Sequence, residues 1–188
     1  MKKVIVVVLV ILVVIGILAG LFIGSYNGFV EKQETVNTAK SAIGVQLQRR
    51  ADLIPNFVAT VKGYSDYEQS TLTAVTEARA AVGKAQTVSE IGEAETQLDK
   101  AISVWVNAVT EAYPDLKANA QYVALQDELA GTENRIATAR KDYNDAAKEY
   151  NVKVRSFPSN IVASMFGFEK AELFTEDESA QSAPVVTF

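Results

Sequence analysis

Two adjacent arginines, a carboxylate and a proline make the most unusual local cluster in this chain. Arg49, Arg50 and Asp52 are followed closely by Pro55 and Asn56. Paired guanidinium groups bind carboxylates and other oxyanions, so this cluster could be a docking site for a partner protein or an anion. It has a structural interpretation as well, in which Asp52 and an arginine pair with charges on neighbouring helices and fix a proline kink. Both interpretations stay open.

A second polar cluster lies between two long helical patterns, in residues 113–119. It contains Asp115 and Lys117, and its proline is Pro114. Functional residues favour loops on rigid scaffolds, so this segment could be an exposed recognition loop for a partner. Alternatively it is turn chemistry, in which Asp115 or Asn119 caps the following helix.

The residue types exclude most catalysis. The chain has no histidine and no cysteine, which removes serine–histidine triads, thiol nucleophiles and most zinc sites. Carboxylates are plentiful, but none has a spacing that distinguishes an acid–base pair or a magnesium site from a solvated helix face. A net charge of −5 does not suit nucleic acid. We therefore expect no catalytic residues, no metal site, no cofactor and no nucleic-acid partner.

Before these clusters comes a segment that could cross a membrane. Residues 4–23 carry no charge and no strongly polar side chain. Twenty helical residues at ~1.5 Å each span the ~30 Å hydrocarbon core of a bilayer. The run is longer than the apolar core of a signal peptide, and no A-x-A-like cleavage site follows it. We expect a retained anchor in membrane lipid, with Lys2 and Lys3 in the cytoplasm and the following domain outside it.

The first helix after this span is expected from about Tyr26 to Tyr64, and only Gly24 and Gly28 interrupt its join to the anchor. Its apolar residues recur at steps of three and four. Pro55 should kink or break it near Ile54. If the helix stays continuous, Arg49 lies ~38 Å beyond Gly24 along the axis, too far to touch the bilayer.

Capping boxes mark the next two helices. After a turn at Gly63, the pattern Ser65-x-x-Glu68 opens a second helix that ends near Gly83, and Thr87-x-x-Glu90 opens a third. The third helix ends at Tyr113, because a residue before proline avoids helical angles. Its expected core positions are Ile91, Ala94, Leu98, Ile102, Trp105, Val109 and Ala112.

The fourth helix has the clearest pattern, a 3.5-residue period that calls for partner helices packed near +20°. It ends at Phe157-Pro158, and a short helical turn could follow from Ser159 to Met165. Its expected core positions are Tyr122, Leu125, Leu129, Thr132, Ile136, Ala139, Tyr143, Ala146 and Tyr150.

No strand-like pattern of useful length occurs, so the predicted fold class is all-α. We expect a single N-terminal transmembrane helix followed by an elongated antiparallel bundle of about four helices. The predicted parts are an anchor at residues 1–25, the bundle at 26–168, and an acidic, flexible tail at 169–188.

The chain resembles the LemA family of bacterial membrane proteins. The resemblance runs from Tyr26 to about Phe174. It implies a short N-terminal anchor and a helical bundle, but no activity and no catalytic residues; Ala39-Lys40 departs from the aromatic that relatives often carry there. The similar stretches are Tyr26–Asn27, Val45–Arg50, Asp52–Asn56, Thr60–Tyr64, Tyr113–Asn119, Leu125–Gln126, Glu128–Leu129, Thr132–Asn134, Arg140–Asn144, Tyr150–Asn151 and Phe157–Ser159.

The leading functional hypothesis is a non-enzymatic scaffold or adaptor, tethered to the cell envelope, that binds other envelope proteins or assembles with itself. The alternative is an extracytoplasmic sensor or ligand-binding module that signals through a partner protein. A carboxylate-based, divalent-ion enzyme is the weakest of the three. The candidate partner-binding residues are Arg49, Arg50, Asp52, Asn56, Asp115 and Lys117.

Overall fold

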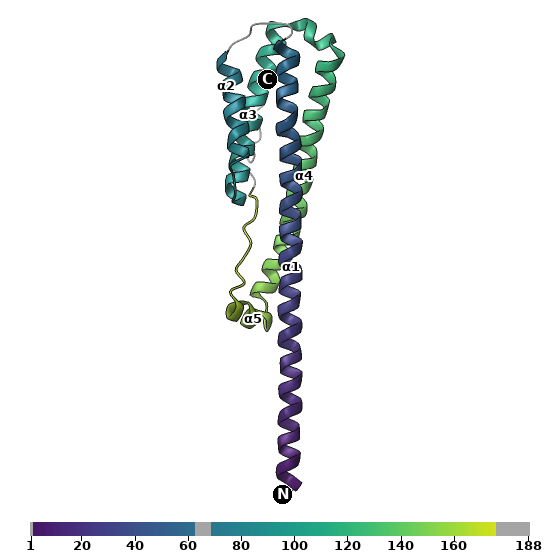
Figure 1. Cartoon of the computed structure of the whole chain (residues 1–188), viewed down its shortest axis with the longest axis vertical. Helices are drawn as coiled ribbons and strands as arrows, with labels where there is room; N and C mark the ends of the chain where they lie inside the picture. The colour runs from purple at the N-terminus through teal and green to yellow at the C-terminus, as the bar shows by residue number, and fades with distance from the viewer. Residues whose placement is uncertain (1, 63–68, 176–188) are drawn as a thin grey trace, which may run out of the picture. The chain divides into compact units, whose positions relative to one another are not determined.

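The computed structural model describes residues 2–62 and 69–175, and it is helical nearly throughout (Figure 1). The described residues contain no strand, so the predicted all-α class is confirmed. The elements in chain order are α1 (Lys2–Lys62), α2 (Gln69–Val82), α3 (Val88–Ala112), the 3-10 helix η1 (Pro114–Ala118), α4 (Ala120–Arg155) and α5 (Ser159–Phe166).

The chain divides into two compact units. Unit 1 comprises Met1–Ala39 with Tyr143–Ala171, and unit 2 comprises Lys40–Asp142 with Glu172–Phe188. The long helices α1 and α4 each contribute one part to each unit. The two units are described separately below.

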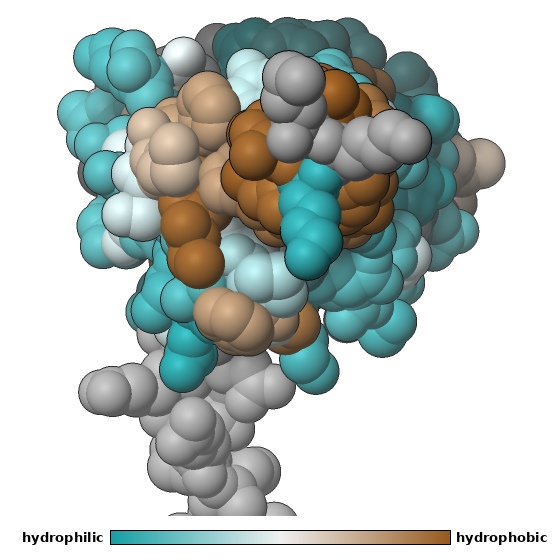
Figure 2. All heavy atoms as spheres, turned by 90° about the horizontal axis from the view of Figure 1, so that it is seen from below, coloured by the Kyte–Doolittle hydropathy of each residue, from teal (hydrophilic) through white to brown (hydrophobic). Residues whose placement is uncertain are grey.

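Helix α1 joins the apolar span and the first bundle helix without an interruption. Its N-terminal part is the one described helix that is long and apolar enough to cross a membrane. Apolar side chains surround it on all sides in the view along its axis (Figure 2) and remain exposed. The apolar run thus has no protein partner within the described chain.

Pro55 does not break α1. The helix continues through it to Lys62, although proline has no N–H to donate. Ile54 and Phe57 on either side of it are buried in the core of unit 2, as is Val61 one turn later. Of the two predicted outcomes, the break near Ile54 is therefore wrong, because core packing on both sides holds the backbone helical.

The core of unit 2 is built around aromatic rings where α1, α3 and α4 meet. The Phe57 ring lies 5.1 Å from Trp105 and 5.0 Å from Tyr122 between centroids. The buried Tyr122 hydroxyl pairs with the Thr110 hydroxyl at 2.9 Å. Within this unit the helices alternate in direction, as the predicted antiparallel bundle requires (Figure 1).

The helix ends of unit 2 follow the local signals in the sequence. The Glu90 N–H donates to Thr87 Oγ1 at 3.2 Å and the Thr87 N–H donates to Glu90 Oε2 at 3.1 Å, which confirms this capping box. Asn119 Oδ1 accepts from the N–H groups of Gln121 and Tyr122, so Asn119 caps α4. Gly63 and the predicted box at Ser65 and Glu68 lie outside the described residues.

The predicted core positions of α3 and α4 are largely confirmed. In α3 the exceptions are Ile91, which is half-buried, and Ala112, which is exposed. In α4, Ala147 is fully buried in place of the predicted Ala146. Leu125 and Ala139 are half-buried.

Unit 1 has an aromatic core where α1, α4 and the chain after α5 come together. Phe29 stacks on Phe168 with centroids 4.8 Å apart and meets the edge of Tyr150 at 6.4 Å. The Lys153 ammonium lies 5.1 Å from the Phe29 ring centroid, over its face. Gly28 leaves room for it, because a Cβ there would lie 2.0 Å from Lys153 Nζ.

The described start of the predicted tail, residues 169–175, has no regular secondary structure but is attached. In unit 1, the Asn151 side chain exchanges two 2.8 Å hydrogen bonds with the backbone of Ala171. In unit 2, Phe174 is buried and lies under the Arg140 guanidinium. The described part of the predicted tail is thus held at two points, and the flexibility of the tail stays a prediction.

Candidate functional site: a charged layer in unit 2

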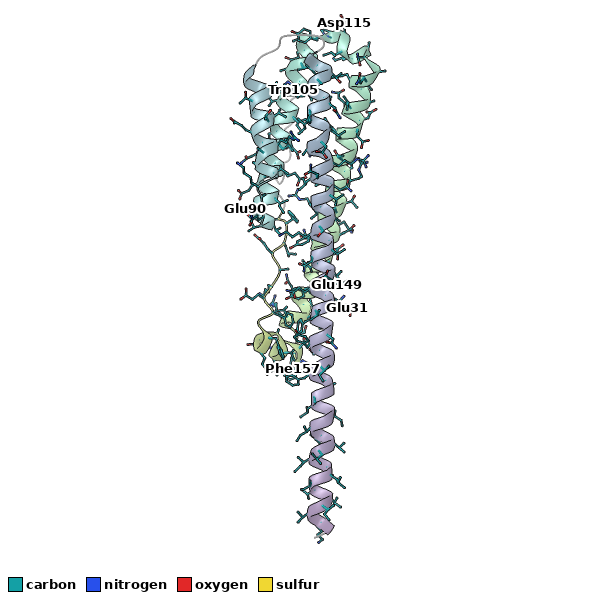
Figure 3. The ribbon with its side chains drawn as sticks, viewed as in Figure 1. Glu31, Glu90, Trp105, Asp115, Glu149 and Phe157 are labelled. Atoms are coloured by element: carbon teal, nitrogen blue, oxygen red, sulfur yellow. The ribbon has the colours of Figure 1, made fainter. Side chains whose placement is uncertain are left out.

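The partner-binding candidates do not form one cluster. Arg49, Arg50, Asp52 and Asn56 belong to α1, whereas Asp115 and Lys117 lie on η1. Figure 3 labels Asp115 at this turn between α3 and α4. Apart from Arg50, these side chains are exposed. They therefore occupy two separate places on unit 2, and their role in partner binding stays a prediction.

Arg50 lies inside the bundle. Only 2% of the residue is exposed, and its guanidinium makes ion pairs with Asp99 of α3 and, at 3.7 Å, with Glu133 of α4. Burying a guanidinium costs several kcal/mol unless it is paired. Arg50 thus ties three helices together through charge, while Asp52 accepts a hydrogen bond from Gln48 within α1 at 2.8 Å.

A second buried pair joins α3 to α4. Glu95 is 3% exposed, and its carboxylate lies 3.2 Å from the Arg140 guanidinium. Arg140 also lies 4.7 Å from the Phe174 ring centroid, over its face, a cation–π arrangement. Gly92 gives the Arg140 guanidinium room, because a Cβ there would lie 3.1 Å from Arg140 Nη2.

A third group of charges lies toward the solvent. The Glu128 carboxylate forms ion pairs with the guanidinium groups of Arg49, at 2.7 Å, and of Arg135, at 2.8 Å. These side chains are more than a third exposed, so water and salt screen the pairs. We call the whole set the charged layer: Arg49, Arg50, Glu95, Asp99, Glu128, Glu133, Arg135 and Arg140.

Two carboxylates of the layer, Glu95 and Asp99, have raised pKa values. Burial raises the pKa of Glu95, and Arg140 opposes that shift. Burial also raises the pKa of Asp99, opposed mainly by Arg50. Glu133 adds repulsion to both carboxylates. These two carboxyl groups therefore bind a proton more readily than ordinary exposed ones do.

The ion pairs of the layer fix the positions of the helices along one another. Each inner carboxylate faces an arginine on another helix, and sliding one helix by a turn would leave a buried charge without a counter-charge. Within residues 2–62 and 69–175, no group of histidine, cysteine, aspartate or glutamate side chains is placed to hold a metal ion. The layer thus explains how the bundle keeps one arrangement.

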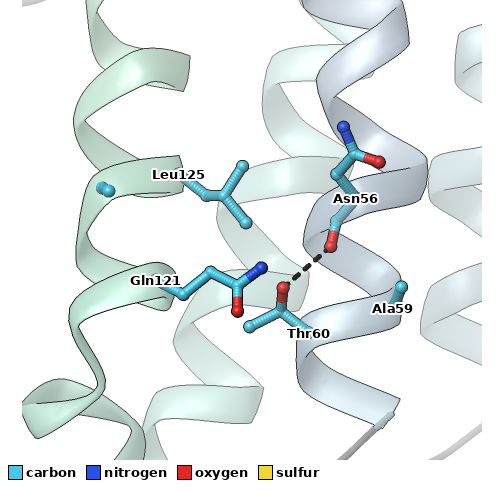
Figure 4. A pocket seen from close by; sticks show the side chains of 6 residues that line it. Asn56, Ala59, Thr60, Gln121 and Leu125 are labelled. Carbon is cyan, nitrogen blue, oxygen red and sulfur yellow. Dashed lines mark hydrogen bonds between the residues drawn. The ribbon is translucent and has the colours of Figure 1, made fainter.

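Asn56 lines an open groove of about 500 Å³ on unit 2. Figure 4 shows Gln121 and Leu125 of α4 opposite Asn56 and Thr60 of α1, with the Thr60 hydroxyl donating to the Asn56 carbonyl at 2.9 Å. The other lining residues are Ala59 and Ala124. This groove is where a small ligand could contact the bundle with amide groups from both helices.

Sequence reasoning missed Glu95, Asp99, Glu133 and Arg140. A weak signal for the first of them was present, because Glu95 lies directly beside the predicted core positions Ala94 and Leu98. A charged residue at such a boundary position looks the same in sequence whether it faces water or an arginine. Arg49 and Arg50 stand out in the sequence, but the sequence does not show which carboxylates on other helices they pair with.

The amino-acid sequence of this chain is similar to those of several known proteins. MamQ 2, a magnetosome protein of Paramagnetospirillum magneticum, is 29% identical over 86% of this chain and 68% of its own length. Protein LemA of Metamycoplasma hominis is 27% identical over 87% of this chain and 74% of its own length. MamQ of Magnetospirillum gryphiswaldense is 26% identical over 86% of this chain and 68% of its own length. The sequence model of the LemA family matches residues 39–188, which include all of the charged layer. The chain therefore belongs to the LemA family.

Proposed function

We propose that this protein is a non-enzymatic, membrane-anchored helical scaffold or adaptor of the bacterial cell envelope. It acts by assembling with itself or by binding other envelope proteins. The observation that carries the proposal is the continuity of α1, which is apolar and exposed on all sides at residues 4–23 and core-packed from Phe29 onward. Such a helix links a lipid-buried rod to a folded bundle without a flexible joint.

The registering role of the charged layer supports a scaffold further. A scaffold must present its outer surface in one fixed arrangement, and buried ion pairs between α1, α3 and α4 penalise sliding. The exposed charges of Arg49, Asp52, Asp115 and Lys117 then serve as partner contacts on a rigid support. The N-terminus lies in the cytoplasm and the bundle outside, because Lys2 and Lys3 precede the apolar span.

Membrane anchoring and topology can be tested together, because the chain has no cysteine of its own. A single exposed cysteine, Asp115→Cys, is introduced into the full chain, and intact cells are treated with a membrane-impermeant maleimide. We expect labelling in intact cells and retention in the membrane pellet after alkaline extraction. A variant lacking residues 1–25 should leave the pellet. Labelling only after permeabilisation would reverse the topology.

The assembly claim has its own measurement. Native mass spectrometry of the full chain in detergent should give a discrete oligomer, or a defined complex with another envelope protein. Charge reversal at Lys117, Lys117→Glu, should weaken that complex if η1 takes part in it. A monomer without a partner, across the detergents in which the protein stays folded, would reject the scaffold proposal.

The groove at Asn56 favours the alternative, a ligand-binding module that signals through a partner. Its amide groups come from α1 and α4, so a small polar ligand would bridge two helices. Saturable stabilisation of the full chain by one small molecule, lost in Asn56→Ala and kept in Lys117→Glu, would favour this alternative over the scaffold.

A further inference from the structure

Unit 1 exposes apolar side chains at a place where water would not favour them. Phe157, in the turn before α5, is 82% exposed, and Met165 in α5 is 65% exposed. Ile161 and Phe166 are also more than a third exposed. The opposite side of α5 packs against the rest of the protein, because Val162 and Ala163 are buried. We call the four exposed residues the α5 patch: Phe157, Ile161, Met165 and Phe166.

The α5 patch is fixed close to the end of the apolar span. The Phe166 ring lies 4.9 Å from the Tyr26 ring between centroids, and Phe168 lies 5.6 Å from Tyr26. Tyr26 follows Ile23, the last residue of the span, by one helical turn, or ~4.5 Å along the axis. Both contacts are within unit 1, so the patch and the span are held in one compact body.

This depth corresponds to the headgroup region of a bilayer. A span that fills the ~30 Å hydrocarbon core leaves roughly 5–8 Å of headgroup layer on each side, and Tyr26 falls within it. Aromatic side chains favour this layer. Figure 2, which looks along α1 from its N-terminal end, shows apolar side chains (brown and tan) gathered beside the α1 rod.

The charge distribution agrees with a lipid contact. Residues 156–168 contain no charged side chain. The exposed Arg155 ends α4 just before this stretch, where it can face anionic headgroups, and Glu169 and Lys170 follow it. A stretch without charges can enter the headgroup layer without the cost of desolvating a charge.

We propose that the α5 patch is a second lipid contact, seated in the headgroup layer of the same membrane that α1 crosses. The proposal rests on the proposed anchoring by α1. The occupant is lipid instead of a second copy or a protein partner, because Tyr26 brings the patch within one turn of the lipid-buried span. The contact fixes the rotation of unit 1 at the membrane surface, which one spanning helix alone cannot do.

The test uses depth-dependent quenching in the full chain, reconstituted in lipid nanodiscs at one copy per disc. Single cysteines at Phe157→Cys and, separately, Met165→Cys carry an environment-sensitive fluorophore. Lipids labelled with a quencher at the headgroup should reduce fluorescence at both positions, and the emission should shift to the blue relative to the detergent-free unfolded chain. The matched control is Glu34→Cys, an exposed position of α1 that lies ~16 Å beyond Ile23 and should not be quenched.

A fourth probe separates this inference from the anchoring on which it rests. Ile15→Cys lies in the middle of the span and should be quenched by lipids labelled deep in the acyl chain. No quenching at residue 15 would reject the anchoring itself. Quenching at residue 15, with probes at residues 157 and 165 that stay as unquenched as the Glu34→Cys control, would reject only the lipid contact. Blue-shifted probes at 157 and 165 that lipid quenchers do not reach would mean that the chain itself covers the patch, and this outcome would also reject the lipid contact.

Discussion

The two units of this chain both pack aromatic rings between their helices, but they differ in the charge that they bury. Unit 2 buries charge beside its aromatic core, with Arg50 and Glu95 nearly inaccessible and each facing an opposite charge on another helix. Unit 1 packs Phe29 at the centre of a cluster that includes Tyr150 and Phe168, and its Lys32–Glu149 ion pair is exposed. The comparison teaches that ring packing is common to both stretches of α1 and α4, whereas the buried ion pairs lie in unit 2.

The difference matters because the two kinds of contact fail differently. A buried ion pair that loses one partner leaves an uncompensated charge, which costs more than the pair contributed. A ring that is replaced by a smaller apolar side chain loses contact area and leaves a partly collapsible gap. Charge therefore selects one register sharply, whereas rings tolerate adjustment.

The largest effect is expected from Arg50→Ala. The substitution leaves Asp99 and Glu133 without their guanidinium, and we expect the bundle of unit 2 to lose about 3–5 kcal/mol of stability. Hydrogen exchange measured by mass spectrometry on the full chain in detergent should show faster exchange across residues 88–112. The control Arg49→Ala removes an exposed pair and should cost no more than about 1 kcal/mol.

The same measurement can break the comparison between the units. If the units open independently, Arg50→Ala should leave exchange in residues 143–155 near its original rate. Equal acceleration in both stretches would mean that the two units unfold as one cooperative body.

A smaller effect is expected in unit 1 from Phe29→Leu. The change removes two ring–ring contacts, each worth about 0.5–1.5 kcal/mol beyond area burial, so we expect a loss of about 1–3 kcal/mol. Faster exchange should appear in residues 143–155. The substitution also removes the ring face that the Lys153 ammonium covers, so a small part of the loss should depend on added salt. Val152→Ala changes an exposed side chain of the same unit and should stay within about 0.5 kcal/mol. A loss in Phe29→Leu no larger than that in Val152→Ala would contradict ring packing as its cause.

Much of this fold could be predicted from the sequence, because several signals are local. The Thr87 capping box and the Asn119 cap depend on residues a few positions apart, and the apolar periods of α3 and α4 reveal their buried faces. The sequence leaves a kink and a break at Pro55 both open, because the choice depends on core contacts of Ile54 and Phe57 with distant segments. The division of α1 and α4 between two units also leaves no mark in their continuous periodic patterns.

The candidate site was much less predictable than the fold. Arg50 stood out because it adjoins Arg49, yet its partners Asp99 and Glu133 come from helices far along the chain. Pairing across helices depends on register and rotation, which apolar periodicity specifies only to within a face. The short helix at Ser159 was anticipated, but its exposed side depends on which face Tyr26 covers.

The smallest effect, and the one that tests the electrostatics of unit 2 most directly, is expected from Glu95→Gln. Burial raises the pKa of Glu95 in the folded chain above its value in the unfolded chain, so the folded state binds the proton more tightly. The carboxyl therefore contributes no penalty at pH values below its unfolded pKa, and it destabilises the bundle increasingly as the pH rises through the folded pKa. Glu95→Gln cannot ionise, so thermal unfolding of the variant and the original chain should differ least in acid, and the variant should gain relative stability toward neutral pH. A variant that instead loses stability toward neutral pH would mean that the Arg140 ion pair outweighs burial at this position.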